Sequence, residues 1–194
     1  MADTAQRRGP AIAGSSWLDV LPLAVRLSFY GDAAARAALA APWGAALSEQ
    51  ALRAAGDDAR AALWLGPDEY LLIDRVTTER GGAGPGVAAA ALLVDTLEAA
   101  LGGLPHAIVD ISHRQVGLMV RGPHAEAILC GACPLDLDIA EFPVGMCTRT
   151  VLAKAEIVLW RTGRDAFQLE VWRSFAAYVT GLLNEIAAEY VERP

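Results

Sequence analysis

The stretch that decides the fold is Phe142-Pro-Val-Gly-Met-Cys-Thr-Arg-Thr-Val-Leu-Ala-Lys-Ala-Glu-Ile-Val-Leu-Trp-Arg161, followed after a short turn by Leu169-Glu-Val-Trp-Arg-Ser-Phe-Ala-Ala-Tyr178. Three consecutive runs in this region resemble strands separated by polar turns: Arg149–Lys154, Glu156–Arg161 and Phe167–Trp172. A helix is predicted to follow from about Ser174, a residue type that caps helices, to Val191. Strands joined by hairpins predict an antiparallel sheet with a helix packed on it.

The rest of the chain is also predicted to consist of strands and helices. Residues alternate between apolar and polar from Leu23 to Tyr30, which predicts a half-buried strand. Asp32 is placed to cap a helix over Ala33–Ala41, which we expect Pro42 to end. Further strands are predicted at Ala61–Leu65, Tyr70–Asp74, His106–Ile111 and Val116–Arg121, and further helices at Val87–Leu101 and from Gly122 to about Cys130. The predicted fold class is α+β, with mostly antiparallel sheets and packed helices.

The domain organisation follows from length and local composition. Residues 1–16 mix polar residues, Gly and Pro without periodicity, so we predict a mobile N-terminal tail. The remaining residues, 17–194, are predicted to form a single α+β domain built from two similar halves.

Composition excludes some classes of partner. Hydrophobic residues make up 54% of the 194 residues and charged residues 20%, so either the core is dense and rich in Ala or a partner covers part of the surface. The net charge of −7 argues against a nucleic-acid partner. The apolar run Val87–Val94 is shorter than the roughly 20 residues of a membrane-spanning helix. We expect no membrane association and, because the N-terminus lacks the pattern of a signal peptide, a cytoplasmic protein.

A pair of cysteines has part of the spacing of a metal or redox site. Cys130 and Cys133 have the spacing of half a zinc knuckle, and Cys147 or His124 could complete four ligands. Structural zinc sites usually pair two such knuckles, and a redox pair would open a helix rather than close one. We therefore predict no metal ligands.

Other motifs point to local structure. Asp110, Ser112 and His113 suggest a hydrolase triad, but adjacent polar residues at the end of a strand usually turn the chain. The segment Gly81–Gly86 lacks the residues of a phosphate loop and is predicted to be a linker. No fingerprint for FAD or NAD occurs, so we predict no catalytic and no cofactor-binding residue in this chain.

Two Trp-Arg pairs at strand ends leave two interpretations open. Trp160 and Arg161 form one pair, and Trp172 and Arg173 form the other. They can be core tryptophans with surface ion pairs, which contribute about 0–1 kcal/mol each. Alternatively they are subunit contacts, because Trp and Arg concentrate the energy of interfaces.

The deciding region also resembles a known family. Together with Val109-Asp-Ile-Ser-His-Arg114 and Cys133-Pro-Leu-Asp-Leu137, the block from Phe142 to Tyr178 is similar to the gamma subunit of heterotetrameric sarcosine oxidase, which is related to folate-binding aminomethyltransferase (T-protein) domains. The similarity extends from about Trp64 to Tyr190. It implies an aminomethyltransferase-like fold and the role of a non-catalytic accessory subunit.

The resemblance also implies the chemistry of a complex. Sarcosine oxidase demethylates sarcosine to glycine and produces hydrogen peroxide and 5,10-methylenetetrahydrofolate. The implied partners are alpha, beta and delta subunits, which would hold FAD, FMN, NAD, zinc and tetrahydrofolate, with none of these in this chain. Two alternatives stay open. One is the small subunit of an N-methylglutamate dehydrogenase-type complex; the other is a free-standing folate-binding protein, in which Asp110, Glu156 or Glu170 would lie near the pterin.

Overall fold

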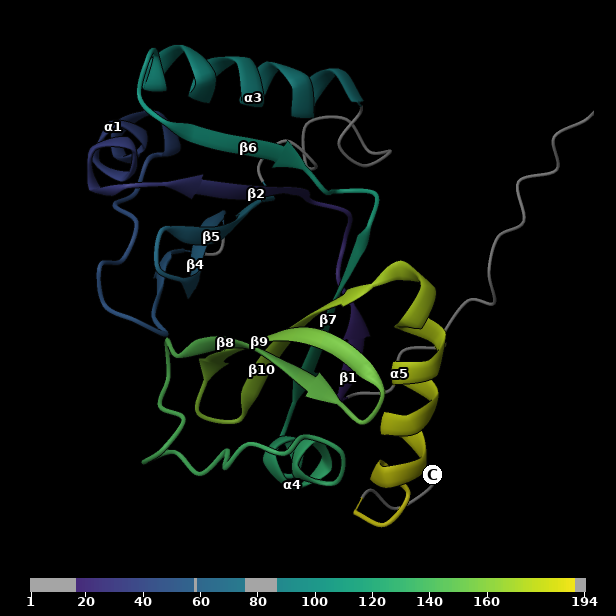
Figure 1. Cartoon of the computed structure of the whole chain (residues 1–194). Helices are drawn as coiled ribbons and strands as arrows, with labels where there is room; N and C mark the ends of the chain where they lie inside the picture. Colours follow the sequence, from purple (N-terminus) through teal and green to yellow (C-terminus); the bar gives the residue numbers. More distant parts are fainter. Residues whose placement is uncertain (1–16, 58, 76–86, 191–194) are drawn as a thin grey trace, which may run out of the picture.

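Two antiparallel sheets form the framework of the protein (Figure 1). The structure is a computed structural model that describes residues 17–57, 59–75 and 87–190. The predictions for the N-terminal tail, for the Gly81–Gly86 linker and for a helix end at Val191 lie outside these residues. Within them each sheet has five strands. The observed mixture of sheets and helices confirms the predicted α+β class.

Sheet A contains the strands of the deciding region. Its strand order is β1-β7-β10-β9-β8, and the bounds are β1 Leu18–Val20, β7 Gln115–Arg121, β8 Cys147–Leu152, β9 Ala155–Gly163 and β10 Ala166–Trp172. Helices α4 (Ala125–Cys130) and α5 (Arg173–Ala187) pack against it. Because residues of a strand alternate between its faces, Phe167, Leu169 and Val171 of β10 all enter the core beneath these helices.

Sheet B is built from the N-terminal part of the chain. Its order is β3-β4-β5-β2-β6, and the bounds are β2 Val25–Gly31, β3 Ala54–Gly56, β4 Arg60–Gly66, β5 Glu69–Asp74 and β6 His106–Asp110. Helices α1 (Ala33–Trp43) and α3 (Val87–Leu101) cover its outer face. The inner face lies against sheet A through a shared apolar cluster that includes Leu63, Ile73 and Val158. The division of residues 17–194 into two similar halves stays a prediction.

Several boundaries differ from those predicted. The three-residue strands β1 and β3 were missed because they are too short to show a period. Helix α5 begins at Arg173 with Trp172 at the cap position and no side-chain cap, so the prediction that Ser174 caps it is wrong. Pro42 lies inside α1, which ends at Trp43, and the following Gly44 adopts the left-handed conformation at φ 84°. The predicted end of this helix at Pro42 is also wrong.

Asp32 caps helix α1 as predicted. Its carboxylate accepts hydrogen bonds from the backbone N–H groups of Ala34 and Ala35, each at 3.0 Å. Asp32→Ala is expected to lower the free energy of unfolding by about 1 kcal/mol, because two amides of the first turn lose their partner. Urea denaturation measures the change. The exposed Asp95 of α3 gives the matched control, and an equal effect of Asp95→Ala would contradict the role of the cap.

Candidate functional site

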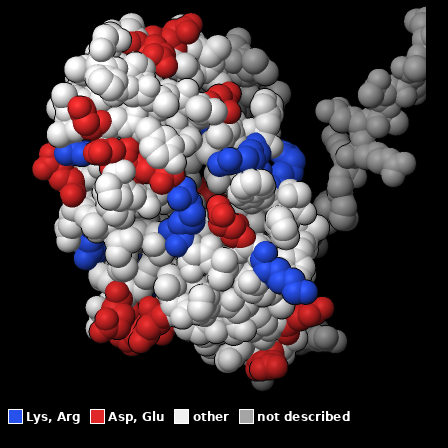
Figure 2. Space-filling model, viewed as in Figure 1, with Lys and Arg blue, Asp and Glu red and all other residues white. Residues whose placement is uncertain are grey.

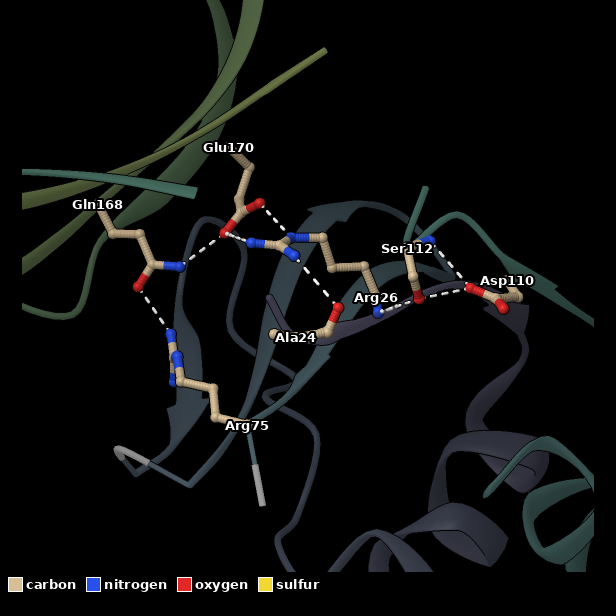
Figure 3. Close-up of polar contacts among 7 residues, drawn as sticks. All are labelled: Ala24, Arg26, Arg75, Asp110, Ser112, Gln168 and Glu170. Atoms are coloured by element: carbon tan, nitrogen blue, oxygen red, sulfur yellow. Dashed lines mark hydrogen bonds and ion pairs between the residues drawn. The ribbon is translucent and has the colours of Figure 1, made fainter. Parts of the chain in front are cut away.

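Several buried polar groups lie where the two sheets face each other (Figure 3). Arg26 of β2 and Glu170 of β10 form a bidentate ion pair, with Nε–Oε2 at 2.5 Å and Nη2–Oε1 at 3.2 Å. Their side chains are only 2% and 1% exposed. We call Arg26, Glu170, Gln168 and Arg75 the polar junction.

Hydrogen bonds complete the polar junction. The Gln168 amide donates to Glu170 Oε1 at 2.7 Å, and Arg75 donates to Gln168 Oε1 at 2.7 Å. Arg26 also donates to the carbonyl of Ala24 at 3.2 Å. A buried ion pair needs such additional partners because both charges have lost their water. The polar junction is therefore an internally satisfied link between the sheets.

The glycine at position 117 makes room for the polar junction. A Cβ atom there would lie 2.8 Å from Arg26 Nη2 and 3.1 Å from Glu170 Oε1. Any larger residue would displace the ion pair, which gives Gly117 of β7 a packing role.

The residues considered for a triad form a turn next to the polar junction. The Ser112 hydroxyl donates to Asp110 Oδ1 at 2.5 Å and accepts from the backbone N–H of Arg26 at 2.9 Å. His113 contributes its carbonyl oxygen, which accepts from Arg173 Nε at 2.9 Å. The structure thus joins Asp110 to Ser112 but does not place Ser112 against an imidazole. This arrangement is typical of a chain turn.

The three carboxylates considered for folate lie at two small cavities. Glu156 and Glu170 line a cavity of about 20 Å³ between the sheets, and Asp110 lines another of about 50 Å³. Pockets for organic ligands usually measure about 300–1,000 Å³. The first cavity is sized for about one water molecule, and Gln115 Oε1, which is buried there, has no hydrogen-bond partner in the described part of the chain.

The cysteines lie in different surroundings. Cys130 is exposed, whereas Cys133 and Cys147 are buried. Among residues 17–57, 59–75 and 87–190, no three or more His, Cys, Asp or Glu side chains come close enough together to hold a metal ion. Burial raises the pKa of the Cys147 thiol from its ordinary value of 9.0 to about 12. Burial also raises the pKa of the Cys130 and Cys133 thiols.

Thiol reactivity provides a test of these surroundings. At neutral pH a thiol reagent is expected to modify Cys130 first and Cys147 only after unfolding, because the thiolate is the reactive form. Mass spectrometry after alkylation measures the order. Since the folded state binds the Cys147 proton more tightly, its stabilising contribution is complete below about pH 9 and is lost as the pH rises toward 12. Equal rates for the Cys147 thiol in folded and unfolded protein would contradict this assignment, and Cys130→Ser identifies the fast site.

The two Trp-Arg pairs have different environments. Arg161 is buried, and its guanidinium donates to the carbonyls of Leu137 at 2.7 Å and Phe142 at 3.0 Å, and to that of Arg164. It also pairs with Glu126 at 3.2 Å. Trp160 is half-buried and packs against the cluster shared by the sheets. Arg161 therefore stabilises the fold from inside the protein. Neither Trp160 nor Arg161 belongs to the contact surface proposed below.

The second pair lies on the surface. Trp172 is 39% exposed, and the Arg114 guanidinium lies 4.9 Å from the centre of its ring. Phe175 and Tyr178, one and two turns further along α5, are also 39% exposed and contact each other edge to face. Sequence reasoning missed Arg114, Phe175 and Tyr178, although Trp172, Phe175 and Tyr178 recur at intervals of three, the spacing of one helix face.

A comparison with solved structures defines the class of protein. Glycine cleavage system aminomethyltransferase T from Bartonella henselae superposes on 90% of this chain and 46% of its own chain, with a TM-score of 0.61 at 19% identity. The fold is therefore aminomethyltransferase-like, as the resemblance implied. None of the helices in the described ranges is long and apolar enough to cross a bilayer.

Closer similarities define the family. The sarcosine oxidase, gamma subunit family matches residues 30–189. Sarcosine oxidase subunit gamma from Corynebacterium sp. strain U-96 is 36% identical over 155 residues, covering 79% of this chain and 69% of that protein. The corresponding Arthrobacter protein is 38% identical over 135 residues, covering 69% and 60%. A structure of heterotetrameric sarcosine oxidase from Corynebacterium sp. U-96 matches with a TM-score of 0.78 and 32% identity over 91% of this chain and 86% of that one. The chain belongs to the sarcosine oxidase gamma subunit family.

Proposed function

We propose that this chain is the gamma subunit of a heterotetrameric sarcosine oxidase and that it supports the assembly without performing the chemistry itself. The observation that carries the proposal is the match to a chain of the heterotetrameric enzyme over 91% of this chain at a TM-score of 0.78. The similarity therefore concerns nearly the whole chain and not one part of it.

The geometry of the chain supports an accessory role. The most buried charged pair, Arg26 with Glu170, is held by internal hydrogen bonds, so neither group is presented to a substrate. Burial raises the pKa of all three thiols, which disfavours the reactive thiolate. The exposed Trp172 and Arg173 are instead residue types that interfaces use. The buried polar groups thus stabilise the fold of this chain, whereas the exposed Trp172 and Arg173 are available for contacts with another subunit.

Following the resemblance, we assign the cofactors to the partner subunits. In this proposal the alpha, beta and delta chains hold FAD, FMN, NAD, zinc and tetrahydrofolate, and the assembled enzyme works in the cytoplasm. It oxidises sarcosine to glycine with release of hydrogen peroxide and transfer of the one-carbon unit to tetrahydrofolate.

Co-expression tests the proposal. A tag on this chain is used to recover the complex with the three other subunits, and the product is examined by its absorbance spectrum and by peroxide release. We expect a yellow complex that turns over sarcosine faster than N-methylglutamate. A colourless lone chain would refute the subunit role, whereas preference for N-methylglutamate would keep the role and change the substrate. Calorimetry of the isolated chain with tetrahydrofolate tests the free-standing alternative, which predicts saturable binding.

A further inference from the structure

Helix α5 has a buried apolar face and, beside it, a second apolar face that is partly exposed. One face, with Val179, Leu183 and Ala187, is buried against sheet A and helix α4. The other presents Phe175 and Tyr178, which lie in line with Trp172 at the start of the helix and are each 39% exposed. A helix at the surface of a monomer normally has one apolar face and one polar face. The second face is therefore partly exposed to solvent, whereas the first is buried inside the protein.

Two guanidinium groups lie beside this second face. Arg114 stacks on Trp172, and the Arg173 guanidinium donates to the backbone carbonyl of His113. Neither guanidinium forms an ion pair in the described part of the chain. The first turn of α5 contains no acidic residue, although the whole chain carries a net charge of −7. We call Trp172, Phe175, Tyr178, Arg114 and Arg173 the basic aromatic face.

Several arginines elsewhere on the surface have an acidic partner. Arg149 pairs with Glu69 at 2.5 Å, and Arg121 pairs with Asp19. Figure 2 shows basic and acidic atoms next to each other across the middle of the molecule. Arg114 and Arg173, like the exposed Arg164, have no acidic partner within the described residues, but Arg114 and Arg173 belong to a patch that also contains exposed aromatic rings.

We propose that the basic aromatic face docks onto a partner subunit of the oxidase, at an apolar patch bordered by carboxylates. This inference rests on the proposed function and names the surface that performs it. Trp, Tyr and Arg are the residues that dominate interface energies, and each guanidinium would gain a charge-assisted hydrogen bond to a carboxylate. The positive end of the α5 dipole adds to the attraction for an acidic surface.

A second copy of the chain fits this face poorly. In a twofold dimer the same patch lies on both sides of the interface, so the basic edge would meet itself. Like charges brought together at an interface oppose binding. Charge complementarity therefore favours a different, acidic partner.

The test measures recovery of the full chain with the co-expressed partner subunits. Phe175→Ser with Tyr178→Ser is expected to weaken assembly by about 30-fold or more, the change that loss of a hot spot produces. Arg173→Glu is expected to weaken assembly too, and it keeps the helix stable because an acidic residue suits a helix N-terminus. The matched controls are Leu92→Ser, an apolar residue 69% exposed on α3, and Arg164→Glu, an exposed arginine without an ion pair. Both controls should assemble like the unchanged chain, and thermal unfolding confirms that all variants fold.

The outcomes separate the two proposals. If the unchanged chain fails to assemble with the subunits, the proposed function fails. If it assembles and both face variants assemble equally well, the docking face is refuted while the function stands. If the face variants instead abolish self-association, measured by sedimentation, or binding to vesicles of phosphatidylcholine and phosphatidylglycerol, the occupant is a second copy or a lipid surface and the inference is overturned.

Discussion

Replacement of Glu170 by leucine is expected to lower the free energy of unfolding by about 3–5 kcal/mol, the usual effect of breaking a buried ion pair by removing one partner. The Arg26 guanidinium is only 2% exposed and donates twice to this carboxylate. Without Glu170 its charge stays buried with one carbonyl partner, the oxygen of Ala24. Gln168 loses the acceptor for its amide as well. Urea denaturation followed by circular dichroism measures the change.

The double variant Arg26→Met with Glu170→Leu provides the control. Apolar residues of similar volume often replace a buried ion pair with little loss of stability, so the double variant is expected to be more stable than Glu170→Leu alone. Additive effects of the two single variants would show that the charges do not act on each other, which would contradict the role given to the polar junction.

The second large effect is expected for Arg161→Met. This substitution removes the donors for the carbonyls of Leu137, Phe142 and Arg164. Each buried acceptor left unpaired costs about 1–3 kcal/mol, so the free energy of unfolding should fall by about 3 kcal/mol or more. Loss of the ion pair with Glu126 contributes less, because that carboxylate is 41% exposed.

Two variants separate the parts of the Arg161 contact. Arg161→Lys is expected to be intermediate, because an ammonium group can reach some of the carbonyls but lacks the planar arrangement of five donors. Glu126→Gln should change stability by less than about 1 kcal/mol. If Arg161→Met were as stable as the unchanged chain and failed only in assembly, Arg161 would be a subunit contact after all.

The strands and helices were predictable where a periodic pattern was long. The helix Val87–Leu101 was predicted with its observed bounds, and the hairpin of β4 and β5 within one residue at each end. Both are local structures whose residues are neighbours in the sequence. The strands β1 and β3 have three residues each and contain no repeat that a pattern could detect.

The polar junction was not predictable for a different physical reason. Gln168 and Glu170 alternate with apolar residues of β10, which normally indicates a face exposed to water. Periodicity tells which residues share a face but not what covers that face. Here the cover is sheet B, and Arg26 comes from a position 144 residues earlier in the chain. Similarly, sequence reasoning treated Arg161 and Arg173 alike, whereas one is inside the protein and the other outside.

The separation of Arg26 from Glu170 also has a consequence for biosynthesis. Sheet B is complete once β6 has left the ribosome, yet its inner face, with the Arg26 charge, waits for β10 near the C-terminus. Contacts this distant in sequence form slowly and leave apolar surface open in the meantime. The nascent chain therefore carries an uncovered sheet while residues 111–172 are synthesised, and its final folding step must follow translation of β10.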